Sequence, residues 1–262
     1  MARIVAVANQ KGGVGKTTTT INLAASLALA DQRVLLVDVD PQGNLTSGMG
    51  QKGKAPPAGT IYDALTASEP AVDARPFIIP TNVDHLYLIP ADRNLTGAEI
   101  ELVTFSAREE RLRALITPLR SAFDYIFIDC PPSLGLLTLN ALVAADTVLI
   151  PLHCEYFALE GLADLVSTMR RVRAALNPSL DIEGVLLTMF DERTNLGQQV
   201  ANDVRQFFKE KVFRTVIPRN VRLGEAPSHG MPVILYDVKS RGAEAYLALA
   251  REVLERSAAT AA

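Results

Sequence analysis

The stretch that decides the fold is residues 9–18, Asn-Gln-Lys-Gly-Gly-Val-Gly-Lys-Thr-Thr. It follows an apolar run at Ile4–Ala8 that is typical of a buried strand, and it precedes residues 19–30, whose large apolar side chains indicate a helix. Glycines let the chain turn tightly and direct consecutive backbone N–H groups inward, and a following helix adds the positive end of its dipole. A strand, a glycine turn and a helix in this order predict a phosphate-binding loop, called the phosphate loop below.

The residue types in the phosphate loop predict its contacts with a nucleotide. Lys16 is expected to reach the β- and γ-phosphates, the Thr17 hydroxyl to coordinate Mg²⁺, and Thr18 to donate to the α-phosphate. The backbone groups expected to surround the phosphates belong to Gly12, Gly13, Val14 and Gly15. An accidental glycine-rich turn is the alternative, and the strand and helix on either side argue against it.

The phosphate loop departs from the standard pattern G-x-x-x-x-G-K-[ST]. Gln10 stands where the first glycine should be, and a second lysine, Lys11, precedes the glycines. This resembles the deviant Walker A motif of the ParA/MinD family of dimeric ATPases, in which the extra lysine crosses to the nucleotide of the partner subunit. The resemblance implies ATP as cofactor, a homodimer formed with ATP, and catalytic roles for both Lys11 and Lys16.

The amino-acid composition limits the classes of protein to which this chain can belong. The 262 residues are 48% hydrophobic, which is enough for a sizeable core and predicts one domain over residues 1–262. The formal charge of -3 neither indicates nor excludes a nucleic-acid partner, because a basic face can be hidden in an average. Two cysteines, Cys130 and Cys154, are too far apart for a CxxC site and favour a reduced, cytoplasmic protein. No apolar run approaches the roughly 18 residues that span a bilayer.

Two further acidic segments end apolar runs. Asp38 and Asp40 follow the second run, and by the resemblance Asp40 positions the attacking water while Asp38 supports the site from behind. A turn-forming role is the alternative for either aspartate alone. Asp129 ends a later run and fits a Walker B element that holds Mg²⁺ through water. Residues 40–59 are rich in glycine and proline and predict a mobile, switch-like loop, or simply a surface connection.

Strand-like runs alternate with helical segments along the chain and predict an α/β fold. It is expected to be a doubly wound, mostly parallel sheet with helices on both faces, as in P-loop nucleotide hydrolases. An amphipathic surface helix is expected over residues 107–119, with its charges forming a solvated face. The expected strands after the first are Arg33–Asp38, Leu86–Pro90, Asp124–Asp129, Thr147–Pro151, Ile182–Phe190 and Phe213–Ile217.

Residues 190–241 carry the expected base-binding and DNA-binding segments. Within them, residues 217–230 together with residues 191–196 closely resemble the Soj-type chromosomal branch of the ParA family. The similarity runs from the phosphate loop to residues 240–244, which is essentially the whole chain. By this resemblance Pro218 packs on adenine and Asn220 reads its edge. The resemblance also implies that Arg193 and Arg222 bind duplex DNA without sequence preference, a role for which guanidinium groups are suited. The further DNA candidates are Arg219, Lys239 and Arg241, and a surface salt bridge is the alternative for any single arginine.

The resemblance implies a segregation switch: a slow ATPase, stimulated by a ParB-like centromere-binding partner, that is nucleoid-associated when bound to ATP. A MinD-like membrane ATPase is one rival, but the tail, residues 243–262, lacks a basic amphipathic helix. An ATP-dependent amide ligase is another, and it would need an acid-binding cluster that the sequence does not display. An iron–sulfur ATPase would need suitably placed cysteines.

Overall fold

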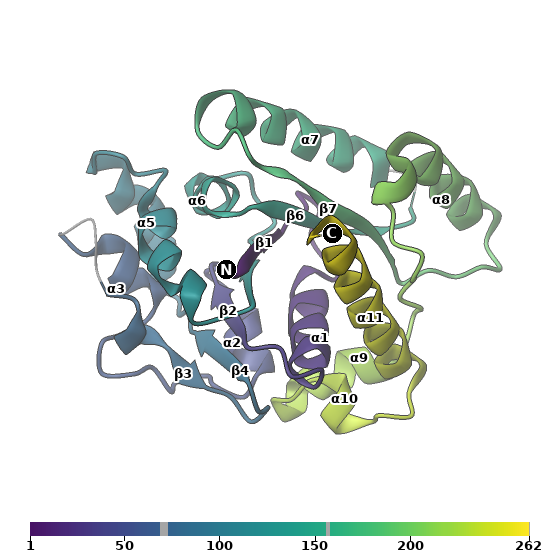
Figure 1. Ribbon diagram of the computed structural model, residues 1–262, viewed down its shortest axis with the longest axis horizontal. Helices are drawn as coiled ribbons and strands as arrows, with labels where there is room; N and C mark the ends of the chain where they lie inside the picture. The colour runs from purple at the N-terminus through teal and green to yellow at the C-terminus, as the bar shows by residue number, and fades with distance from the viewer. Residues whose placement is uncertain (69–72, 156–157, 262) are drawn as a thin grey trace.

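The architecture is a sheet of seven strands with helices on both faces (Figure 1). The computed structural model describes residues 1–68, 73–155 and 158–261. The spatial order of the strands is β3-β4-β2-β5-β1-β6-β7, and every neighbouring pair is parallel except β3 with β4. The strands are β1 Arg3–Val7, β2 Val34–Asp38, β3 Ile79–Pro80, β4 Leu86–Ile89, β5 Tyr125–Asp129, β6 Thr147–His153 and β7 Asp181–Thr188. The predicted doubly wound, mostly parallel fold is confirmed.

Parallel register gathers the carboxyl ends of the strands at one edge of the sheet. In β5, Asp129 lies opposite Val7 of β1 on one side and Asp38 of β2 on the other. The phosphate loop leaves β1 at this same edge. Chain connectivity therefore brings the loop and both aspartates together, as the Walker A and Walker B assignments require.

Helices cover the sheet in two layers (Figure 1). One layer is formed mainly by α1 and α11, whose buried side chains share a core with β1, β2 and β5. The other is formed by α3 and by α5 to α8. The α-helices are α1 Lys16–Ala28, α2 Asn44–Gly48, α3 Ile61–Thr66, α4 Leu95–Glu101, α5 Arg111–Ile116, α6 Leu136–Ala144, α7 Ala158–Ala175, α8 Asn195–Phe208, α9 Val221–Glu225, α10 Val233–Tyr236 and α11 Arg241–Ala261.

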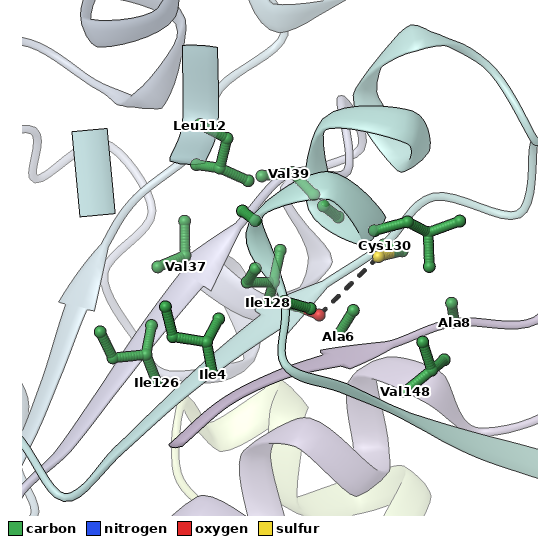
Figure 2. Packing of buried hydrophobic residues seen from close by; sticks show 14 of the residues in the cluster. Ile4, Ala6, Ala8, Val37, Val39, Leu112, Ile126, Ile128, Cys130 and Val148 are labelled. Carbon is green, nitrogen blue, oxygen red and sulfur yellow. Dashed lines mark hydrogen bonds between the residues drawn. The ribbon is translucent and has the colours of Figure 1, made fainter. Parts of the chain in front are cut away.

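Side chains of the central strands alternate between the two cores. Ile4 and Ala6 of β1 join the layer of α5 to α8, whereas Val5 and Val7 join the layer of α1 and α11. Figure 2 shows the first of these cores, with Ile4 and Ala6 beside Ile126 and Ile128 of β5. Because these strands are buried on both faces, their sequences are continuously apolar and do not alternate between apolar and polar residues.

The prediction of a last strand at Phe213–Ile217 is wrong. Its two end residues each donate a backbone hydrogen bond to β7, over 3.0 and 2.9 Å. Between them, the N–H groups of Arg214 and Thr215 donate to the carboxylate of Glu252 on α11, at 2.8 and 2.9 Å. A buried side chain thus replaces part of the β-ladder, and the segment lies along β7 with isolated bridges only.

One other expectation needs correction. The helix expected over residues 107–119 starts only at Arg111, and the Arg111 side chain is buried rather than solvated. Its guanidinium donates to the carbonyls of Leu65 and Ala67, so it caps the end of α3. In the segment 40–59, the structure has the short helix α2 followed by turns, because Asp38 accepts hydrogen bonds from Thr46.

Within the described residues, no helix combines the length and the apolar character needed to cross a membrane. Both cysteines are free thiols with buried side chains.

Candidate nucleotide site

A cavity of about 480 Å³ opens at the carboxyl edge of the sheet, beside the phosphate loop. Its walls come from segments far apart in the sequence: the phosphate loop, the end of β2, the end of β7 and the loop before α9. The predicted site residues among its lining are Gly12, Gly13, Gly15, Lys16, Thr17, Thr18, Asp40, Pro218, Arg219 and Asn220. The fold therefore assembles the predicted phosphate, carboxylate and base-binding groups around one space.

The phosphate loop has the backbone geometry that its glycines allow. Gly13 and Gly15 adopt positive φ angles of 74° and 89°, a region that other residues rarely enter. Helix α1 begins at Lys16, directly after Gly15. The Lys16 ammonium is buried and donates to the carbonyl of Lys11 across the loop, at 3.2 Å. Burial lowers the pKa of Lys16, and the nearby Asp129 carboxylate opposes that effect.

A set of hard oxygen groups lies at the start of α1. The Thr17 hydroxyl donates to Asp129 over 2.8 Å, and the Thr20 hydroxyl donates to the other carboxylate oxygen over 3.1 Å. Burial is the main reason that the pKa of Asp129 is raised to about 8, and the neighbouring Asp38 carboxylate raises it further. Such a carboxylate gains strongly from a cation, and a hydroxyl beside a carboxylate is a donor set that suits Mg²⁺. Among the described residues, no cluster of three or more His, Cys, Asp or Glu side chains could hold a metal ion by itself.

Asp38, the last residue of β2, and Asp40, just beyond it, have different surroundings. Asp38 is fully buried and accepts hydrogen bonds from the N–H and hydroxyl of Thr46, at 2.9 and 2.7 Å. Burial raises the pKa of Asp38 to about 6. Asp40 lines the cavity, and its Oδ1 accepts the N–H of Gln42 at 2.9 Å. Asp38 thus anchors the turn from behind, and Asp40 presents a carboxylate with a fixed orientation to the cavity.

The environment of the Lys11 side chain differs from that of Lys16. The Lys11 ammonium is 2.6 Å from Glu155, two residues beyond the end of β6, rather than among the groups that line the cavity. Glu155 also lies 3.0 Å from Nδ1 of His153. About a third of the Lys11 side chain is exposed. The second lysine of the loop is therefore held at the outer rim.

The side of the cavity at which the sequence predicts base binding, called the base side below, is formed by residues 217–220, Leu223, Gly224 and the end of β7. Pro218 lies in an isolated bridge with Phe190. The Asn220 side chain accepts the N–H of Arg222 at 3.0 Å and so caps α9, which leaves its amide nitrogen for other contacts. Arg219, expected among the DNA-binding residues, is found lining the cavity.

Arg193 and Arg222, the two main DNA candidates, each pair with carboxylates of this chain. Arg193 is 88% exposed at its side chain and is 2.6 Å from Asp191. Arg222 contacts Glu225 at 2.7 Å and Asp237 at 3.2 Å. Exposed ion pairs of this kind contribute little to stability. Breaking them so that the arginine can pair with a phosphate therefore costs little free energy.

Several residues of the site have no sequence pattern that marks them as part of it. Thr20 was one of four consecutive threonines, and only its position one turn after Lys16 places it against Asp129. Asn9 donates to the carbonyl of Pro151 at 2.8 Å and accepts the N–H of Lys11 at 3.0 Å. Thr188 and Tyr246 come from β7 and α11, and long-range packing alone brings them to the cavity.

Comparison with known proteins gives matches over nearly the whole chain. A family model described as an AAA domain matches residues 2–182. A chromosome partitioning protein ParA of Myxococcus xanthus is 58% identical over 256 residues, which cover 98% of this chain and 89% of the relative. The sporulation initiation inhibitor protein Soj of Bacillus subtilis is 58% identical over 253 residues, 97% of this chain and 98% of the relative.

A similar solved structure is that of cobyrinic acid a,c-diamide synthase from Mycobacterium smegmatis, with bound ADP and magnesium. Its TM-score is 0.83 at 38% identity, and the match covers 97% of this chain and 94% of that one.

Proposed function

Because this chain belongs to the ParA/Soj family of chromosome partitioning proteins, we propose that it is an ATP-driven switch for DNA segregation. In this proposal Mg²⁺ and ATP bind in the cavity, two ATP-bound copies form a dimer, and the dimer binds duplex DNA without sequence preference. A ParB-like centromere-binding protein stimulates an otherwise slow hydrolysis, which releases the DNA. The useful output is the difference in DNA affinity between the two nucleotide states.

The residues of the cavity suit hydrolysis of a phosphoanhydride. Backbone N–H groups of the phosphate loop and the Lys16 ammonium would neutralise the phosphate charge, and Thr17 with Asp129 would hold Mg²⁺, Asp129 through water. The ion would supply further stabilisation of charge that develops on the phosphoryl oxygens. Asp40 would orient the attacking water, because its carboxylate is fixed by Gln42 and faces the same cavity.

The observation that carries the proposal is the position of Lys11. A lysine that belongs to a phosphate loop but stays at the rim of its own cavity is available to a nucleotide bound by a second copy. Its contact with Glu155 is a partly exposed ion pair, which costs little to break. Hydrolysis would then require the dimer, since each active site would lack one cation without its partner.

Size-exclusion chromatography with light scattering tests this step. We expect the wild-type protein to be monomeric with Mg-ADP and dimeric with Mg-ATP, and Lys11→Ala to bind ATP but hydrolyse it poorly. Glu155→Gln is a matched control that keeps the lysine and removes only its resting partner. Monomeric wild-type protein at saturating ATP would contradict the proposal.

The amide-ligase alternative has a specific basis in the similar synthase structure, at 38% identity. The partitioning relatives are considerably more similar, at 58%. Binding of arbitrary duplex DNA in the ATP state separates the two functions, because an amide ligase has no need of it.

A further inference from the structure

The phosphate loop is held by a residue that lies outside the strand, turn and helix of its motif. Thr188 is the last residue of β7, and its hydroxyl donates to the carbonyl of Val14 at 2.8 Å. Both residues are 2% exposed. The same side chain packs over Gly15, where an added Cβ would lie 3.9 Å from the Thr188 Cβ and Cγ2 atoms.

This hydrogen bond fixes the orientation of one peptide group. In a planar trans peptide, the carbonyl oxygen and the following N–H point in opposite directions. The described residues contain no cis peptide bonds, so the Val14 carbonyl that points to β7 directs the Gly15 N–H away from β7. Gly15 is among the residues that line the cavity.

The covalent chain alone does not choose this orientation. Gly15 has a φ of +89°, and glycine takes positive and negative φ with similar ease. Rotation of the Val14–Gly15 peptide would turn the Gly15 N–H toward β7, and the φ preference of glycine does not oppose it. An external hydrogen bond is therefore needed to select the conformer.

We propose that Thr188 is a positioning residue that fixes the Val14–Gly15 peptide and so aims the Gly15 N–H at the phosphates of a bound nucleotide. This inference rests on the proposed function, because it assigns the cavity to a nucleotide. It adds a requirement that the loop motif does not contain, namely a hydroxyl at the end of β7.

The residues that follow Thr188 also contribute to the cavity. Met189, the next residue, lines the cavity and has a φ of 47°, a region unfavourable for a side chain of its type. Phe190 then donates its N–H to the carbonyl of Ile217 at 3.0 Å, next to Pro218 on the base side. Residues 188–190 thus connect the phosphate side of the cavity to its base side.

Calorimetric titration of the full chain with Mg-ADP tests the proposal on three variants. Thr188→Val keeps the side-chain shape but leaves the buried Val14 carbonyl without its donor, and we expect affinity to fall about fivefold as the competent loop conformer becomes less populated. Thr188→Ser restores the hydroxyl and should restore affinity.

The matched control is Thr147→Val. Thr147 is also a buried threonine on a core strand, and its hydroxyl donates to Glu183 at 2.6 Å, at the opposite edge of the sheet. We expect this variant to lose thermal stability as Thr188→Val does, and to bind Mg-ADP with wild-type affinity.

Equal affinities for wild type and Thr188→Val would overturn the inference and leave the nucleotide site intact. A wild-type protein that does not bind Mg-ADP would instead refute the proposed function, and the inference with it. Should Thr188→Val not fold, Thr188→Ala replaces it, and an affinity equal to that of Thr188→Ser is then the contradicting result.

Discussion

The Glu252 carboxylate, which supports the segment leading to the base side of the cavity, gives a quantitative prediction. It is 3% exposed at its side chain and accepts the N–H groups of Arg214 and Thr215 while pairing with Arg256 at 2.7 Å. Hydrogen bonds to a charged group contribute about 1.5 to 3 kcal/mol each, against about 0.5 to 1.5 for neutral ones. Glu252→Gln removes the charge and turns these two hydrogen bonds into neutral ones. It should therefore lower the free energy of unfolding by about 2 kcal/mol.

Urea denaturation at equilibrium measures this effect, with Glu255→Gln as the control. Glu255 lies one turn along α11, is 65% exposed and pairs with Arg214, so its loss should cost under about 1 kcal/mol. Equal destabilisation by the two variants would refute the assignment of Glu252 as the residue that replaces the β-ladder.

The same carboxylate predicts a pH dependence. Burial raises the pKa of Glu252, but the N–H groups of Arg214 and Thr215 and the Arg256 charge outweigh it, so the net pKa lies below the ordinary value. A carboxyl whose pKa is lowered on folding stabilises the protein above its unfolded pKa, about 4.3, and loses that contribution as the pH falls through the folded pKa. The stability gap between wild type and Glu252→Gln should therefore be full at pH 6 and narrow below about pH 4.

Three further predictions concern the cavity and the DNA candidates. Lys16→Ala should weaken Mg-ATP binding by about 100-fold in calorimetry, since it removes a charge-assisted contact of about 3 kcal/mol; wild-type affinity would contradict its role. Asp40→Ala should lower the hydrolysis rate about 100-fold or more while the ATP-bound dimer still forms, as seen by light scattering. A variant that stays monomeric with ATP would contradict a role for Asp40 in hydrolysis alone. Arg222→Ala should dimerise normally but bind duplex DNA less tightly, with the salt slope of binding reduced by about one per subunit; an unchanged slope would remove Arg222 from the DNA contact.

The sequence predicted well those features that depend on local pattern and on parallel topology. The phosphate loop, the central strands and the meeting of Asp38 with Asp129 follow from apolar runs that end at one edge of a sheet. Once the strands are parallel, the carboxyl ends converge whatever the intervening sequence.

Features that depend on one distant side chain could not be predicted in this way. Nothing in the segment 213–217 indicates that Glu252, on another element, takes two of its N–H groups. The same limit applies to Arg111, which reads as a surface charge until the end of α3 is placed beside it. Thr188 is a third case, because a threonine at a strand end has many ordinary uses and only its contact with Val14 marks it.

The central claim is that nucleotide state controls DNA affinity, and binding to a duplex of arbitrary sequence tests it most directly. Fluorescence anisotropy with a labelled duplex would be recorded in Mg-ADP and in Mg-ATP, each at two salt concentrations, with Arg193→Ala/Arg222→Ala as the control variant. We predict binding with ATP only, weakened by salt and by loss of the two arginines. Absence of binding with ATP, or equal binding with ADP, would contradict the account.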